Sequence, residues 1–117
     1  MKVFLVLMLA AVGLLAADAT GTWTGSLTRA DGEQGGAHLV LKQDGQKVTG
    51  TAGPGPGEQH DIQNGKSEGG KLTFEVPREN GTMTFVLKQE GDEIKGEVSM
   101  VRDGEVQRGQ LAVTRGK

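Results

Sequence analysis

Apolar and polar residues alternate with a period of two along most of this chain after residue 20. Such alternation is typical of antiparallel strands that bury one face and expose the other. It predicts an all-β domain of about eight short strands. The expected inward positions are Trp23, Gly25 and Leu27; Leu39 and Leu41; Val48 and Gly50; Ile62; Leu72, Phe74 and Val76; Met83, Phe85 and Leu87; Ile94, Gly96, Val98 and Met100; and Leu111 and Val113.

Short turn signals separate these runs. Glycine adopts the positive φ that tight hairpins require, and a preceding Asn or Asp tolerates it. Most of these pairs are expected to close hairpins, whereas Asn64-Gly65 is alternatively a bulge within a strand. Consecutive hairpins predict an up-and-down antiparallel meander that closes into a small barrel, with a two-sheet β-sandwich as the alternative. The pairs are Asp31-Gly32, Asp44-Gly45, Asn64-Gly65, Gly69-Gly70, Asn80-Gly81, Glu90-Gly91 and Asp103-Gly104.

The chain also contains an internal repeat. Residues 39–50 read LVLKQDGQKVTG, and residues 85–96 read FVLKQEGDEIKG. Each copy has the form of a β-hairpin, in which an acidic residue and a glycine separate two alternating runs. The repeat therefore predicts a barrel built from two similar halves.

Two segments interrupt the alternation. The stretch Gly53–Gly57 reads GPGPG, and proline cannot donate to a β-ladder, so a surface loop is expected there. In a meander this loop lies at the barrel end opposite the turn at Asp44-Gly45. Val106 sits on the other parity from Leu111, which predicts a bulge or break near Gly109.

The first residues have the pattern of a secretory leader rather than of a folded strand. A short basic start precedes an apolar run over residues 3–15. This run is shorter than the roughly 20 residues that a membrane-spanning helix needs. No membrane span is therefore expected after processing, and the protein is expected to be secreted, either periplasmic or extracellular.

The leader ends in small residues. Ala17-Asp18-Ala19 offers an A-x-A cleavage pattern, which predicts a signal peptide over residues 1–19 and a single barrel domain over residues 20–117. Cleavage two residues earlier, between Ala17 and Asp18, is the alternative.

Composition narrows the function classes. The 117-residue chain has no Cys, so neither a disulfide nor a lipid-modified Cys is available. Its net charge is −2 with no basic stripe, and it carries a single Trp and no Tyr, so nucleic-acid binding is not expected. The chain is expected to be a monomer.

Catalytic and metal-binding patterns are sparse. The two histidines are His38, expected on an exposed strand face, and His60, at the far end of the glycine–proline stretch. His60 and Asp61 are adjacent, so they point to opposite faces if the segment is extended. No serine lies in a nucleophile motif. The sequence predicts no catalytic residue, no metal site and no cofactor, and hence not an enzyme.

Gly21-Thr22-Trp23 opens the first strand, and Arg115 ends the last. This pattern resembles the calycin superfamily of lipocalins, fatty-acid-binding proteins and avidins. In lipocalins a G-x-W motif begins the first strand, and a late basic residue packs over its Trp at the closed end of the barrel. The resemblance implies a lipocalin-like barrel with one closed and one open end.

The chain is also similar to small secreted bacterial β-proteins of unassigned function. Those proteins share a Trp-x-Gly near the start, a Gly-x-Leu-x-Phe strand and a later Gly-Asp-x-Ile-x-Gly strand. Here these segments read Trp23-Thr24-Gly25, Gly70-Lys71-Leu72-Thr73-Phe74 and Gly91-Asp92-Glu93-Ile94-Lys95-Gly96. This second resemblance implies no activity.

The candidate binding residues come from the large side chains on the inward stripe, together with His60 near the expected mouth. They are Trp23, Phe74, Met83, Phe85, Met100 and His60. Such a stripe is either a packed core or the lining of an apolar pocket. The first hypothesis is a secreted, non-catalytic binding module for a small apolar or amphipathic ligand. The alternative is an envelope or extracellular protein-interaction or inhibitor-like domain with a packed core and no small ligand.

Overall fold

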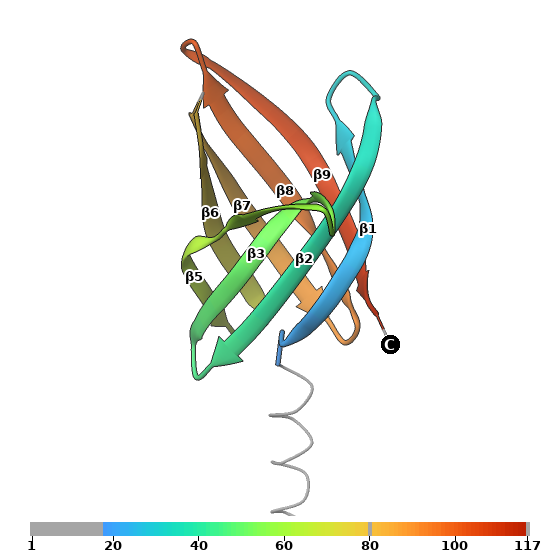
Figure 1. Ribbon diagram of the computed structural model, residues 1–117, viewed down its shortest axis with the longest axis vertical. Coiled ribbons are helices and arrows are strands. Elements are labelled where there is room, and N and C mark those ends of the chain that lie inside the picture. The colour runs from blue at the N-terminus through green and yellow to red at the C-terminus, as the bar shows by residue number, and fades with distance from the viewer. Residues whose placement is uncertain (1–17, 80, 117) are drawn as a thin grey trace, which may run out of the picture.

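The computed structural model describes residues 18–79 and 81–116, which form a single antiparallel sheet (Figure 1). Of the expected leader, only Asp18 and Ala19 belong to the described residues, and the rest lies outside them. No helix within the described part of the chain is long and apolar enough to cross a lipid bilayer. The strands are β1 Gly21–Arg29, β2 Gln34–Asp44, β3 Lys47–Gly55, β4 Glu58–Asp61, β5 Gln63–Glu68, β6 Lys71–Arg78, β7 Gly81–Glu90, β8 Glu93–Arg102 and β9 Glu105–Arg115.

The sheet closes on itself. Its strand order is β2-β1-β9-β8-β7-β6-β5-β3, and β2 also pairs with β3, so eight strands form a ring. β4 is an additional short strand that pairs with β3. The predicted eight-stranded antiparallel meander barrel is confirmed, and the β-sandwich alternative is wrong because one continuous sheet surrounds the core.

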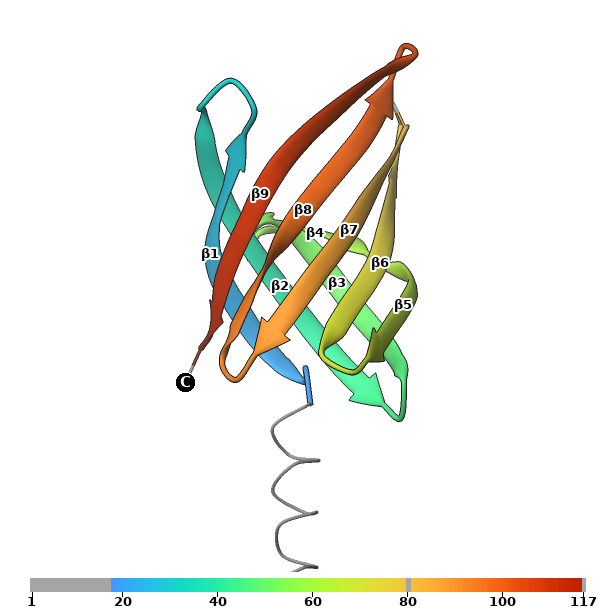
Figure 2. The same cartoon turned by 180° about the vertical axis from the view of Figure 1, so that it is seen from behind.

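The hairpin turns gather at two ends of the barrel (Figures 1 and 2). The β2–β3, β5–β6 and β7–β8 turns lie beside the start of β1, at what we call the closed end. The β1–β2, β6–β7 and β8–β9 connections lie at the opposite, open end. Successive connections therefore alternate between the ends, as a meander requires.

The two repeat copies form the equivalent hairpins β2–β3 and β7–β8. Leu41 pairs with Gly50 in the first hairpin, and Leu87 pairs with Gly96 in the second. Gly45 and Gly91 open the two turns with φ of 65° and 61°. The repeat in sequence is thus a repeat in register.

The glycine–proline stretch differs from the surface loop that the sequence predicts. β3 continues through Pro54 to Gly55, and a tight turn at Pro56 and Gly57 returns the chain as β4. The pairing of β3 with β4 shifts register between Ala52 and Gly55. A proline is accommodated at such an irregularity because it is not required to donate to the ladder. The glycine–proline stretch is therefore part of the sheet rather than a loop outside it.

Asn64 forms the bulge that the sequence offered as an alternative to a turn. Its φ is 54°, and the pairing of β5 with β6 shifts register between Gln63 and Lys66. Asn suits this position because it tolerates positive φ, and Gly65 follows it where the backbone of Val48 leaves no room for a Cβ.

The bulge predicted near Gly109 is wrong. β8 and β9 pair without a shift along their whole length, from Glu93 and Thr114 to Arg102 and Glu105. Val106 keeps its outward parity and is half exposed, so no break is needed to explain it.

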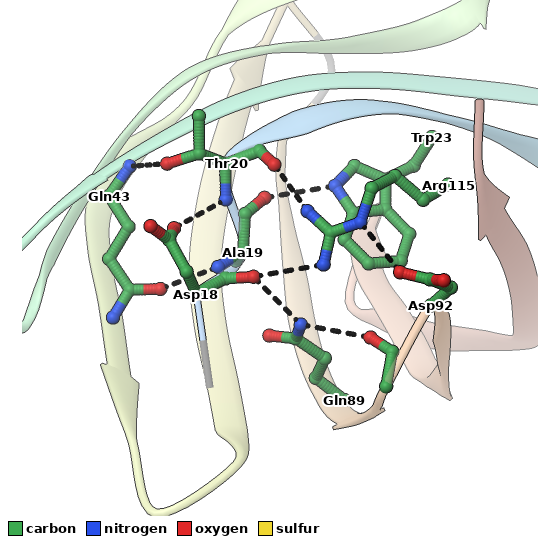
Figure 3. Close-up of polar contacts among 9 residues, drawn as sticks. Asp18, Ala19, Thr20, Trp23, Gln43, Gln89, Asp92 and Arg115 are labelled. Atoms are coloured by element: carbon green, nitrogen blue, oxygen red, sulfur yellow. Dashed lines mark hydrogen bonds and ion pairs between the residues drawn. The ribbon is translucent and has the colours of Figure 1, made fainter. Parts of the chain in front are cut away.

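Large side chains fill the barrel toward its closed end. The indole of Trp23 is fully buried, and its Nε1 donates to the carbonyl of Ala19 at 2.9 Å (Figure 3). The Arg115 guanidinium lies over the Trp23 ring, 4.4 Å from its centroid. The other large side chains that are fully buried are Phe74, Leu39, Leu72, Ile94, Val48 and Val113.

Inward glycines bring neighbouring strands close together at mid-barrel. A Cβ added at Gly25 would overlap the backbone of Ala112, and one added at Gly96 would overlap the backbone of Val86 and Leu87. Gly50 and Gly65 show the same close approach in β3 and β5. Glycine at such points lets strongly coiled strands cross tightly, which helps the ring to close.

Replacing Gly96 by Ala should lower the free energy of unfolding by about 1–3 kcal/mol, the usual cost of overpacking. Urea unfolding followed by the fluorescence of Trp23 measures this loss. Gly35→Ala is the matched control in β2, because nothing lies within 4 Å of the added Cβ. The control should stay within about 0.5 kcal/mol of the parent. Equal stability of both variants would contradict the close crossing at Gly96.

Trp23→Ala should cost about 3–5 kcal/mol, because it deletes a fully buried aromatic side chain. Circular dichroism during urea unfolding gives the measurement, since this variant lacks the fluorophore. Trp23→Phe keeps most of the apolar area and should lose less. A loss below about 1 kcal/mol for Trp23→Ala would remove the indole from the core.

Candidate functional site

The open half of the barrel encloses a hollow of about 1000 Å³. Its deepest lining comes from Leu39, Phe85 and Leu111, which are nearly fully buried. Phe85 in turn stacks on its ladder partner Phe74 of β6, with ring centroids 4.4 Å apart and planes 21° from parallel. The hollow thus rests on the packed closed half of the barrel.

The hollow follows from the sizes of the inward residues along each strand. In β2, the inward series runs from Leu41 and Leu39 near the closed end to Ala37 and Gly35 near the open end. β3 and β9 show the same trend, with alanine or glycine at inward positions in their open halves. Small side chains cannot fill an eight-stranded barrel, so space remains where they line it.

Two flexible methionines form the wall of the hollow that lies opposite β2 and β3. Met83 of β7 and Met100 of β8 are partners in the ladder and line the hollow together. Both are partly buried. Methionine adapts its shape readily because it is unbranched and polarizable.

Charged side chains surround the mouth. Arg29 of β1 pairs with Glu33 at 3.2 Å, and Arg108 of β9 lies 3.9 Å from Glu97. These ion pairs are exposed and therefore contribute little to stability. Arg29 also lines the hollow, whereas the Arg108–Glu97 pair lies on the outward face of β8 and β9, so the polar rim on this side of the mouth comes from Arg29.

Glu58 of β4 lies at the mouth, where its carboxylate approaches side chains of β4 and β6. Its Oε2 lies 3.3 Å from His60 Nε2 and 4.0 Å from Arg78 Nη2 of β6. Glu58, His60 and Arg78 all line the hollow. The β4 strand therefore places a mixed cluster of charge and imidazole at one side of the entrance.

Gln59 fastens β4 to the barrel. Its amide group donates to the carbonyls of His38 at 3.1 Å and Gly55 at 3.0 Å, and its Oε1 accepts from the Thr51 hydroxyl at 2.5 Å. Because Gln59 points onto the sheet, its neighbours Glu58 and His60 are presented at the mouth.

The structure divides the predicted site residues into two groups. Met83, Phe85, Met100 and His60 come together around the hollow. Trp23 and Phe74 do not line it and are buried in the packed half. As predicted from their adjacency, His60 lines the hollow whereas the neighbouring Asp61 does not.

Sequence reasoning missed the residues that leave the space open. Ala37 and Ala52 are buried, line the hollow and face inward from β2 and β3. Small residues at inward positions indicate open space inside a barrel, whereas the candidate residues above were chosen as large apolar side chains. Arg29 and Arg78 were missed because strand parity does not show which turns share a barrel end.

Ionisable chemistry is limited in the described residues. No group of three or more His, Cys, Asp or Glu side chains there is placed to hold a metal ion. The pKa of Asp18 is lowered by hydrogen bonds from the side chain and then the backbone of Thr20. That carboxyl group lies at the closed end, away from the hollow.

Comparison of the chain with protein-family models, curated proteins and solved structures gave no significant match in any of the three.

Gln59→Ala should release β4 from the sheet. Loss of its buried amide contacts should lower stability by about 1 kcal/mol and speed hydrogen exchange at the β4 amides. Exchange measured by mass spectrometry on peptides covering residues 58–61 tests this. Gln34→Ala removes a single exposed hydrogen bond to Thr28 and serves as the control. Unchanged exchange in the Gln59 variant would contradict the fastening role.

Proposed function

We propose that this protein is an exported, non-catalytic binding module that takes a small apolar or amphipathic molecule into the open end of its barrel. The observation that carries the proposal is the hollow of about 1000 Å³ with a buried apolar floor. Ligand sites are typically concave and mostly apolar, with a few polar groups that fix orientation.

The distribution of polarity favours a ligand inserted with its apolar part first. Leu27, Val98 and Leu111 line the interior together with the two methionines. The arginines and His60 lie at the rim, where they remain accessible to water. An amphipathic molecule would thus bury its hydrocarbon part and leave its polar end among charged groups.

The resemblance to calycins supports the same proposal. The predicted pairing of Trp23 with a late basic residue is present, since Arg115 packs over the indole at the closed end. Residues 18–20 and the turns of three hairpins lie at that end, so the opposite end is the entrance. A lipocalin-like barrel with its ligand at the open end is the finer form of this proposal.

Ala52→Phe tests the proposal by filling the hollow from β3. Ala52 is buried and lines the hollow, so an aromatic ring there would occupy the space that a ligand needs. Titration with N-phenylnaphthylamine, an apolar fluorescent probe, should give a Kd at least about tenfold higher for this variant, a loss of about 1.4 kcal/mol.

Ala112→Phe is the matched control, because Ala112 points outward from β9. It should bind the probe like the parent chain. Equal weakening in both variants, or equal binding in both, would contradict binding in the hollow. Native mass spectrometry of protein purified from its own host then shows which molecule accompanies it.

A protein-interaction domain is the second candidate, and the tip of the β8–β9 hairpin favours it. Val101 and Val106 face each other across this hairpin and are 54 % and 50 % exposed. Exposed apolar side chains in contact with each other suit a protein partner. Val101→Thr should weaken such an interaction and leave probe binding unchanged, whereas Ala52→Phe should do the reverse.

A further inference from the structure

The residues that precede β1 are part of the barrel's core. Ala19 is 0 % exposed and belongs to the main hydrophobic cluster. Its N–H donates to Gln43 Oε1 at 2.7 Å, and its carbonyl accepts from Trp23 Nε1 at 2.9 Å. A residue held in this way is a structural element of the folded domain rather than the end of a leader.

Asp18 is held through its backbone. Its carbonyl accepts hydrogen bonds from Gln89 Nε2 and from Arg115 Nη2, both at 3.0 Å (Figure 3). Gln89 comes from the end of β7 and Arg115 from the end of β9, so Asp18 joins two strands that are distant in sequence.

Thr20 continues the same connection. Its carbonyl accepts from Arg115 Nη1, and its hydroxyl accepts from the backbone N–H of Gln43 at 2.9 Å. Residues 18–20 therefore lie at the closed end of the barrel and are hydrogen-bonded there to β2, β7 and β9 (Figure 3).

The sequence alone allowed leader cleavage either after Ala19 or after Ala17. Cleavage after Ala19 would remove five hydrogen bonds and leave the buried Nε1 of Trp23 without its acceptor. An unpaired buried donor is destabilising. Cleavage after Ala17 keeps every one of these contacts.

We infer that the leader is removed between Ala17 and Asp18, and that the new N-terminal segment, residues 18–20, seals the closed end of the mature barrel. A host signal peptidase would hydrolyse the Ala17–Asp18 peptide bond after a small residue. Water supplies the oxygen of the new Ala17 carboxylate, and the Asp18 nitrogen becomes an ammonium group.

The direct test is the N-terminus of the exported protein. The full chain is expressed in a secreting bacterial host, purified from the exported fraction, and analysed by intact mass and N-terminal sequencing. A mature chain that begins Asp18-Ala19-Thr20 supports the inference. A chain that begins at Thr20 or later, or one that retains its leader, overturns it.

A second test asks whether the segment matters for packing. Leaderless chains beginning at Asp18 and at Thr20 are released from a fusion with native N-termini. The longer chain should melt at least about 5 °C higher, a shift typical of a substantial stability difference in a domain of this size. If the shorter chain does not fold, the sealing role is supported as well. Equal Tm values for the two chains overturn it. Asp18→Asn in the longer chain is the control, because it keeps the backbone carbonyl, and its Tm should stay close to the parent value.

Discussion

The seam between β1 and β9 is the contact on which the rest of the structure depends, because it turns an open sheet into a barrel. Its first register pair joins Trp23 to Arg115. The guanidinium of Arg115 covers the indole and also binds Asp92 Oδ1 at 2.9 Å and the carbonyls of Asp18 and Thr20. The side chain of Arg115 therefore joins the β1–β9 seam to the β7–β8 turn and to residues 18–20. A closed sheet has no exposed edge strands, which removes a route to aggregation.

Dense packing and open space occupy different levels of this barrel. Packed large residues at the closed end supply most of the buried apolar area, which is the dominant stabilising term in a small domain without disulfides. The open half contributes less to stability, so small residues such as Ala37 and Ala52 can occupy its inward positions and leave space. An apolar hollow costs stability because its lining loses packing contacts, and the dense closed half compensates for this cost.

The sequence predicted the barrel well because strand parity, hairpin turns and the internal repeat all indicate the same meander. It missed β4, because the glycines and prolines of residues 53–57 indicate a loop, and it marked β5 only weakly. β5 turns Gly65 and the hydroxyl of Ser67 inward, so it lacks the apolar alternation that identifies a strand. Within the site, parity correctly placed Met83, Phe85 and Met100 inside the barrel. It did not separate them from Trp23 and Phe74, because parity gives neither the height of Trp23 along the barrel nor the stacking of Phe74 on Phe85.

The two walls of the hollow differ in the flexibility of the side chains that line them. The β2–β3 wall is formed by backbone and methyl groups, which are rigid and offer shape but few adjustable contacts. The opposite wall carries Met83 and Met100, whose side chains reorient at low cost. The mouth between them combines arginines with Glu58 and His60 on a strand that Gln59 holds in place. Under the proposed binding function, the rigid wall would discriminate by shape, the methionines would tolerate variation, and Glu58 and His60 of β4 would select a polar end group.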